Sequence, residues 1–192
     1  DNFAFWLLCG LLPWNFFGLV TSLGLGAISA NAGLVRRVAF PREVLVFSNV
    51  LHACVQFSIE MVLLFIVLLV GGAHFLPWIP IVLFTSVLLA IFATGIAMAL
   101  SVLAVYFRDV SYLWAIVTQV WFFATPIVYP PSTLEAEAPR WIYNILQLNP
   151  MNGFVEVYRR LLYDGAAPGL TTMAGLVVIS AASLTIGWTI FH

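Results

Sequence analysis

The charged residues of this chain are scarce and gather in short stretches between apolar runs. The sequence has seven basic and eight acidic side chains in 192 residues, and residues 31–43 hold four of them, namely Arg36, Arg37, Arg42 and Glu43. Guanidinium groups in a short turn can make charge-assisted hydrogen bonds to carboxylates on a partner, or can anchor a membrane topology. Pro41 lacks a backbone donor and restricts Phe40, so a helix should break or restart there. We expect a short amphipathic helix with its arginines facing water or a partner.

The remaining reactive residues form no catalytic set. Every basic residue is Arg, which excludes from this sequence both the lysine of a P-loop and a Schiff-base lysine. Cys9 and Cys54 lie in apolar runs and are expected to be free thiols. Neither forms a C-x-x-C or Cys/His cluster that could hold a metal. Paired carboxylates, a Ser/His/Asp set and a Gly-rich phosphate loop do not occur in the sequence. We therefore expect no enzyme activity, no metal and no cofactor in this chain.

The composition predicts an all-α, polytopic membrane domain. The chain is 63% hydrophobic and 8% charged, with a mean hydropathy of +1.07, whereas soluble domains are roughly a quarter charged. A net charge of −1 argues against nucleic acid as a partner, because no basic face exists to neutralise phosphates. Long apolar runs predict membrane-spanning helices at residues 3–30, 45–71, 81–105, 111–129 and 171–191.

The arginines set the expected orientation of these spans. Arg36 and Arg37 in one short loop and Arg108 in another place both loops on the cytoplasmic side. Asp109 suits the beginning of the next helix, where the helix dipole favours negative charge. The last span ends at His192, which lies on the cytoplasmic side provided that the preceding apolar stretch does not cross the membrane.

That preceding stretch, residues 141–163, is long enough to span but is interrupted. Asn149 and Pro150 break the apolar run, and three charges follow that would be costly in lipid. Two short half-helices that dip into the outer leaflet are therefore expected. Glu156 and Arg160 stand four residues apart, which predicts an ion pair on one helix face. An interfacial amphipathic hairpin is the alternative.

Polar and small residues inside the spans suggest further contacts. Glu60 lies near the middle of the second span, where an ionised carboxylate is costly. Gln56, one turn earlier, can hydrogen-bond it, and three interpretations stay open: an inter-helix hydrogen bond, a polar patch on a transport path, and a proton relay. Gly18, Ser22 and Gly26 recur every four residues and favour the close approach of a second helix.

Four short strings carry a resemblance to a known family. They are NAGLVRRVAFPRE (31–43), YFRDV (106–110), TPIVYP (125–130) and NPMNGFVEVYR (149–159). In this order and spacing they resemble the ABC-2-type membrane subunits of the polysaccharide and polyol phosphate export family, the permeases for O-antigen, teichoic acid and galactan. The resemblance covers essentially the whole chain. It implies a six-span type V exporter fold in the bacterial inner membrane, with five spans and re-entrant outer half-helices in this sequence, and an interfacial helix and a first span before Asp1.

The resemblance also implies partners and site residues. It implies a homodimer, in membrane lipid, with two separate ABC ATPase chains that carry ATP and Mg, and a lipid-linked polysaccharide on a polyprenyl diphosphate as cargo. Coupling to the ATPase is then expected at Arg36, Arg37, Phe40, Pro41, Arg42, Glu43, Arg108 and Asp109. Contacts with the sugar chain are expected at Trp14, Phe16, Phe17, Glu60, Trp121, Phe122 and Tyr129. An outer gate is expected at Asn149, Pro150, Glu156, Tyr158 and Arg159.

Three other functions share parts of this pattern. An ABC-2 exporter of drugs or small lipids would have the same fold and coupling loop with a narrower path. A polytopic enzyme acting on prenyl phosphates would need clustered acidic or basic residues at one membrane face, and the sequence offers only Arg108, Asp109 and scattered acids. A purely structural membrane scaffold would show no distinguishing feature.

Overall fold

The computed structural model describes residues 3–37, 40–73, 75–129 and 149–192, without the side chains of residues 35–37. Long apolar helices dominate it: α1 (Phe3–Ala30), α3 (Glu43–Val70), α4 (Ile79–Tyr106) and α9 (Leu170–Phe191). Each has the length and hydropathy of a membrane span. Their bounds agree with the predicted spans to within a few residues, because apolar length alone sets such helices.

Shorter helices connect these four. They are α2 (Ala32–Arg37), the 3-10 turn η1 (Leu76–Trp78), α5 (Val110–Ala124) and α8 (Pro150–Leu162). The expected break near Pro41 is confirmed, since α2 ends at Arg37 and α3 begins at Glu43. The fourth predicted span, residues 111–129, is shorter than expected. At ~1.5 Å per residue α5 covers only about two thirds of a ~30 Å hydrocarbon core, and it stops where Thr125 turns extended before Pro126.

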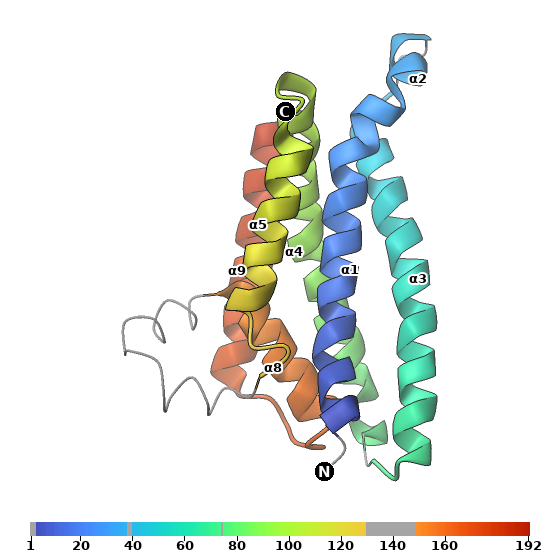
Figure 1. The fold of residues 1–192 in the computed structure, drawn as a ribbon, viewed down its shortest axis with the longest axis vertical. Helices are drawn as coiled ribbons and strands as arrows, with labels where there is room; N and C mark the ends of the chain where they lie inside the picture. Colours follow the sequence, from blue (N-terminus) through green and yellow to red (C-terminus); the bar gives the residue numbers. More distant parts are fainter. Residues whose placement is uncertain (1–2, 38–39, 74, 130–148) are drawn as a thin grey trace.

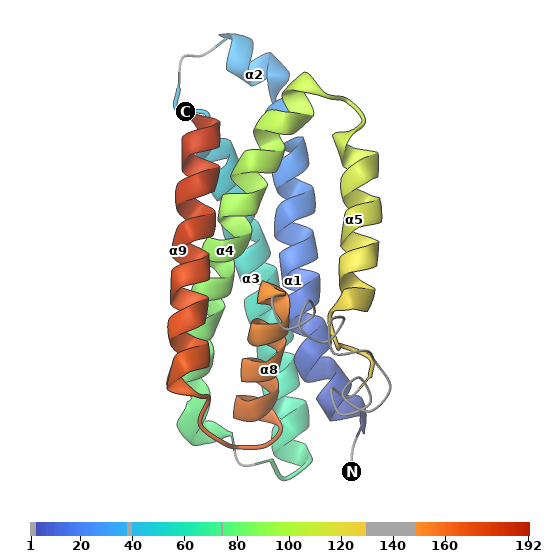
Figure 2. The ribbon, with the colours of Figure 1, turned by 90° about the vertical axis from the view of Figure 1, so that its left-hand side faces the viewer.

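The two ends of the bundle separate the loops as predicted. Figure 1 shows α2, the α4–α5 turn and the C-terminus at one end, and the N-terminus, the α3–α4 turn and α8 toward the other. Figure 2 shows the same division after a quarter turn. The described half-helix α8 does not cross the bundle, so the C-terminus lies at the arginine-bearing end, in agreement with the expected parity. The first expected half-helix, 141–148, lies outside the described residues.

Helix α4 is the central packing element. It contacts α1 and α9 most extensively, and α1 also packs on α3 and α8. A Cβ at Gly24 of α1 would come within 2.5 Å of the Ala97 side chain, and Gly95 of α4 faces Gly187 of α9 without room for a side chain. Ser180 and Ser183 of α9 donate hydrogen bonds to backbone carbonyls of α4, at 3.0 and 2.8 Å. Small residues thus let these helices approach closely, as is usual in membranes.

Among the described residues, no helix packs closely on the face with Gly18, Ser22 and Gly26. A Cβ added at Gly18 or at Gly26 would meet nothing within 4 Å, and the contact of α1 with α4 instead uses Gly24. A close contact at the predicted face would therefore have to come from a second copy of the chain. The Gly18–Gly26 face remains open toward the side on which α5 lies.

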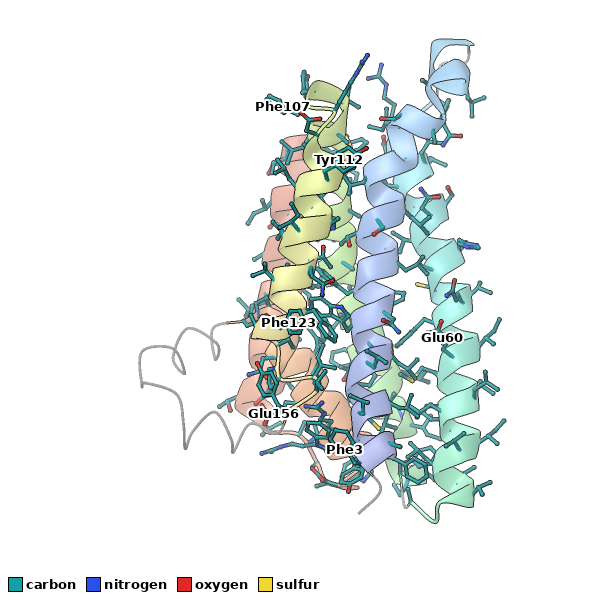
Figure 3. All side chains as sticks on the ribbon, in the orientation of Figure 1. Phe3, Glu60, Phe107, Tyr112, Phe123 and Glu156 are labelled. Carbon is teal, nitrogen blue, oxygen red and sulfur yellow. The ribbon has the colours of Figure 1, made fainter. Side chains whose placement is uncertain are left out.

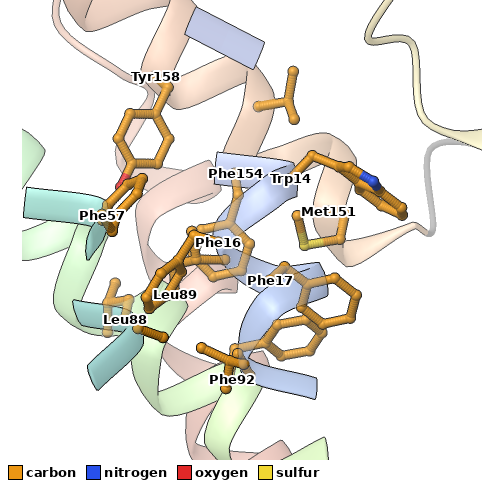
Figure 4. Close-up of a cluster of buried hydrophobic side chains, with 14 of the residues drawn as sticks. Trp14, Phe16, Phe17, Phe57, Leu88, Leu89, Phe92, Met151, Phe154 and Tyr158 are labelled. Atoms are coloured by element: carbon orange, nitrogen blue, oxygen red, sulfur yellow. The ribbon is translucent and has the colours of Figure 1, made fainter. Parts of the chain in front are cut away.

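The core between these helices is aromatic at the level of α8. Figure 4 shows Phe16, Phe17, Phe92 and Phe154 in one buried cluster with Met151. Phe17 and Phe154 are fully buried, and their ring centroids lie 5.8 and 5.7 Å from that of Phe92. Such pairs add roughly 0.5–1.5 kcal/mol beyond area burial. The cluster fixes α8 against α1 and α4.

Candidate functional site: a polar groove and a re-entrant junction

A groove of about 910 Å³ runs along the side of the bundle between α1 and α5. Small and polar side chains of α1 form one wall, and the α4–α5 turn and α5 form the other. The hydrogen-bonding residues lining it are Asn15, Ser22, Ser29, Ser111, Thr118 and Gln119, and the aromatic ones are Trp14, Trp114 and Phe122. The open Gly18–Gly26 face of α1 contributes Gly26 to this wall.

Charge in the groove is confined to one end. Arg108, in the α4–α5 turn at the α2 end, is its one charged lining residue among those the structure describes. The indole N–H of Trp114 is buried and has no hydrogen-bond partner in the described part of the chain. Hydroxyls, amides and aromatic faces in one apolar-walled channel can bind a polyhydroxylated chain by stacking and by exchangeable hydrogen bonds.

The predicted sugar-contact residues divide between groove and core. Phe122 lines the groove, and Trp14 borders it while only 6% exposed and packed against Phe17 and Phe122. Trp121 lies behind them, with its indole N–H donating to Asn149 at 2.7 Å. The Tyr129 hydroxyl donates to the Phe123 carbonyl, also at 2.7 Å, so it closes a local turn.

Phe16 and Phe17 correct the prediction. Phe16 is 2% exposed and packs on Phe57 of α3, and Phe17 is fully buried against Phe92 of α4. Phe16 lies about 200° around the helix from Trp14, which turns it away from the groove. Phe17 lies only about 60° from Trp14. Packing against Phe92 and Trp121 buries its ring. Their rings therefore build the core of the chain and present no face to the groove.

Glu60 also lies outside the groove. It borders a separate small cavity between α1 and α3, together with Asn15 and Phe16, and Figure 3 shows it beside α3. Gln56 donates a hydrogen bond to Glu60 at 3.0 Å, as its position one turn earlier predicted.

The chain leaves the helical conformation after α5, and the side chain of Asn149 hydrogen-bonds both the end of α5 and the beginning of α8. Its amide oxygen accepts from Trp121 Nε1 at 2.7 Å and from the Met151 N–H at 3.0 Å. Its amide nitrogen donates to Thr125 Oγ1 at 2.8 Å. Asn149 is thus the N-cap of α8, with Pro150 at the first helical position, and both residue types suit a helix start.

Arg159, toward the other end of α8, hydrogen-bonds the residues that follow α5. Its Nη1 and Nη2 donate to the carbonyls of Pro126 and Ile127 at 2.6 and 2.7 Å. Its guanidinium lies 3.4 Å from the centroid of the Trp6 ring, a cation–π contact. Arg159 is 6% exposed, and the described residues place no carboxylate within ion-pairing distance of it. We call Trp121, the turn 125–129, Asn149 and Arg159 the re-entrant junction.

The other predicted gate residues occupy different surroundings. Tyr158 is fully buried, and its hydroxyl lies 2.7 Å from the Ser86 hydroxyl of α4. Glu156 and Arg160 form the predicted ion pair at 3.3 Å, with both side chains 46% exposed. Helix α8 therefore has one buried face, with Tyr158 and Arg159, and one exposed, paired face.

At the α2 end the predicted coupling residues lie near the surface. Pro41, Arg42, Arg108 and Asp109 are exposed, while the Arg36 and Arg37 side chains lie outside the described part. Asp109 is the N-cap residue of α5 without a side-chain capping bond. Phe40 is partly buried and packs against the chain's own core. Glu43 begins α3.

Sequence reasoning missed several residues of the junction. Gly10 has no room for a Cβ, which would come within 2.8 Å of Arg159 Nη2. Trp6 lies under the guanidinium, and Ser86 accompanies Tyr158. A glycine and a tryptophan in a membrane helix are unremarkable by composition, so only the packing of α8 against α1 identifies them.

The sequence profile of the ABC-2 type transporter family matches residues 2–163. The chain is 32% identical over 193 aligned positions to the O-antigen export system permease protein RfbA of Myxococcus xanthus, covering 100% of this chain and 73% of that protein. It is 30% identical to the protein of the same name from Klebsiella pneumoniae, covering 85% of this chain and 62% of that one. Polysialic acid transport protein KpsM of Escherichia coli is 24% identical, with coverages of 100% and 73%.

Proposed function

Because the chain belongs to the ABC-2 type transporter family, we propose that it is the membrane-spanning subunit of an ATP-driven exporter that moves a lipid-linked polysaccharide across the bacterial inner membrane. The chain itself is a multi-pass membrane protein. It spans 73% and 62% of the lengths of the two O-antigen permeases named above, so the activity of the whole transporter is part of the proposal.

The observation that carries the proposal is the groove between α1 and α5. It combines aromatic rings with hydroxyls and amides, and it has a cation at one end only. A sliding polymer needs many weak contacts of this kind and no tight one, because a deep binding site would hold the chain in place. The groove is open on its side, which suits a wall that a second copy of this chain completes in a homodimer.

Energy would enter at the α2 end. ATP and Mg are then bound by separate ATPase chains, and this chain performs no chemistry of its own. Arg36, Arg37 and Arg42 would make charge-assisted hydrogen bonds to acidic groups of the ATPase. The short α2, set off from α3 by the break before Glu43, would pass the movement of the ATPase to the long helices.

The test fills the groove. Ser22 is exposed and lines the groove on α1, while Ser58 is exposed on α3 away from it. In the complete transporter, Ser22→Trp is expected to abolish appearance of the polysaccharide at the cell surface and to leave lipid-linked glycan inside. Ser58→Trp should export normally, since it adds the same ring to a lipid-facing helix.

Both variants are compared at equal membrane levels. Normal export by Ser22→Trp would refute the groove as the path. ATPase activity that responds to hydrophobic drugs and not to the lipid-linked glycan would instead indicate a drug or small-lipid exporter.

A further inference from the structure

We infer that Arg159 is a positioning residue that holds the outer end of the transport path closed. It does so by donating hydrogen bonds to the backbone carbonyls that follow the end of α5. The inference rests on the proposed function, because it assigns a role in gating to a residue of the proposed exporter. The guanidinium of Arg159 binds two backbone carbonyls and an indole ring, and it is seated over Gly10.

Ending α5 inside the membrane carries an energetic cost. Helix α5 has 15 residues and is too short to cross the hydrocarbon core, so the turn 125–129 lies at membrane depth. Backbone carbonyls there have no water to bond, and each one left unsatisfied costs several kcal/mol. Within the described chain, the carbonyls of Pro126 and Ile127 receive no backbone donor, and Arg159 supplies one to each.

Burying the cation carries a cost as well. A buried guanidinium without a carboxylate is expensive unless its donors are used. Here two donors face the carbonyls, a third N–H points at the Trp6 carbonyl at 3.4 Å, and the Trp6 ring stacks on the plane. The turn and the arginine therefore each need the other, and separating them exposes both to a medium that satisfies neither.

Arg159 joins parts of the chain that must separate when the path widens. Arg159 belongs to α8, the two carbonyls follow α5, and Trp6 and Gly10 belong to α1. One side chain thus joins α8 and α1 to the turn that follows α5, and α1 and α5 form the two walls of the groove. Widening the groove at its outer end requires α5 to move away from α1, and that movement breaks the contacts of Arg159.

Arg160 offers a matched control. It is the next residue of the same helix and the same type, yet it is 46% exposed and paired with Glu156. A change at Arg160 removes the same charge from α8 without touching the turn. Any effect common to both positions would therefore come from the net charge of the helix and not from the junction.

The experiment uses the complete transporter with its ATPase, reconstituted in liposomes without ATP, and measures the leak of a small fluorescent sugar. Arg159→Met is expected to raise the leak at least about tenfold, the change that each ~1.4 kcal/mol lost from the closed state produces. Arg160→Met should leave it unchanged. Arg159→Lys keeps the charge but loses the planar fork that reaches both carbonyls and stacks on an aromatic ring, so an intermediate leak is expected.

A double-mutant cycle separates this role from general destabilisation. Gly10→Ala places a methyl group 2.8 Å from Arg159 Nη2 and should raise the leak in the otherwise unchanged protein. An Arg159→Met background removes the contact with Nη2 and leaves the contact with Val155 Cγ1 at 3.2 Å, so Gly10→Ala should add much less there. Independent damage would instead add equally in both backgrounds.

The proposal is overturned by an assembled Arg159→Met transporter that does not leak, by equal leaks at Arg159 and Arg160, or by additive effects in the cycle. If neither Arg159→Met nor Gly10→Ala assembles, the contact serves folding alone and the gating role is wrong. Failure of the proposed function would look different: the unaltered transporter would then not export polysaccharide, whatever the leak.

Discussion

The arginines at the two ends of the bundle have opposite surroundings. At the α2 end, Arg42 and Arg108 are exposed, and at the α8 end Arg159 is 6% exposed and bound to backbone carbonyls. An exposed cation at a membrane face is free to meet another protein, whereas a buried one is committed to its own chain. The contrast fits the proposals that the α2 end meets the ATPase and that Arg159 holds the other end closed.

The largest expected effect tests the contact end. Arg36→Glu together with Arg37→Glu reverses two charges in α2 and should abolish both export and co-purification with the ATPase, because like charges would face its acidic groups. Membrane insertion should stay intact, as measured by membrane fractionation of the variant. Unchanged export would end the assignment of this element to coupling.

The next effect tests the closure end. Asn149→Ala removes the amide that joins Trp121, Thr125 and the Met151 N–H, and should lower the free energy of unfolding by about 2–3 kcal/mol, since buried donors lose their acceptor. Thermal unfolding of the detergent-solubilised protein measures it. Asn152→Ala, on the same helix without a side-chain hydrogen bond among the described residues, is the control; an equal loss there would contradict the assignment.

The smallest effect concerns the exposed face of α8. Glu156→Gln breaks the ion pair with Arg160, whose side chains are both 46% exposed. Such pairs contribute at most about 1 kcal/mol, so thermal stability and export should change little. A large loss would show that this face is covered in the assembled transporter, and the contrast between the two faces of α8 would need revision.

Some elements were predictable because their causes are local. The start of α8 follows from Asn149 and Pro150, an N-cap residue followed by a residue that fits the first turn. The Glu156–Arg160 pair follows from helical spacing. The break before α3 follows from Pro41. Each of these outcomes depends on a few neighbouring residues and on no contact with another helix.

The candidate site was predictable only in part. Sequence reasoning named Trp14 and Phe122, which line the groove, but also Phe16 and Phe17, which fill the core. It named Arg159 without its carbonyl partners. Every face of these helices is apolar, so no hydrophobic period marks which side meets another helix, and the choice between adjacent aromatic residues is made by packing.

The sequence by itself determined the helical class and the long membrane spans and predicted their orientation, because a bilayer demands long apolar helices with arginines on one side. Only the tertiary structure decided that Arg159 is buried while Arg160 is exposed, and that small residues at Gly24 and Gly95 are contacts while Gly18 is not. The physical reason is that packing against other helices sets the rotation of each helix about its axis. Adjacent residues of the same type, such as two arginines, do not reveal that rotation in the sequence.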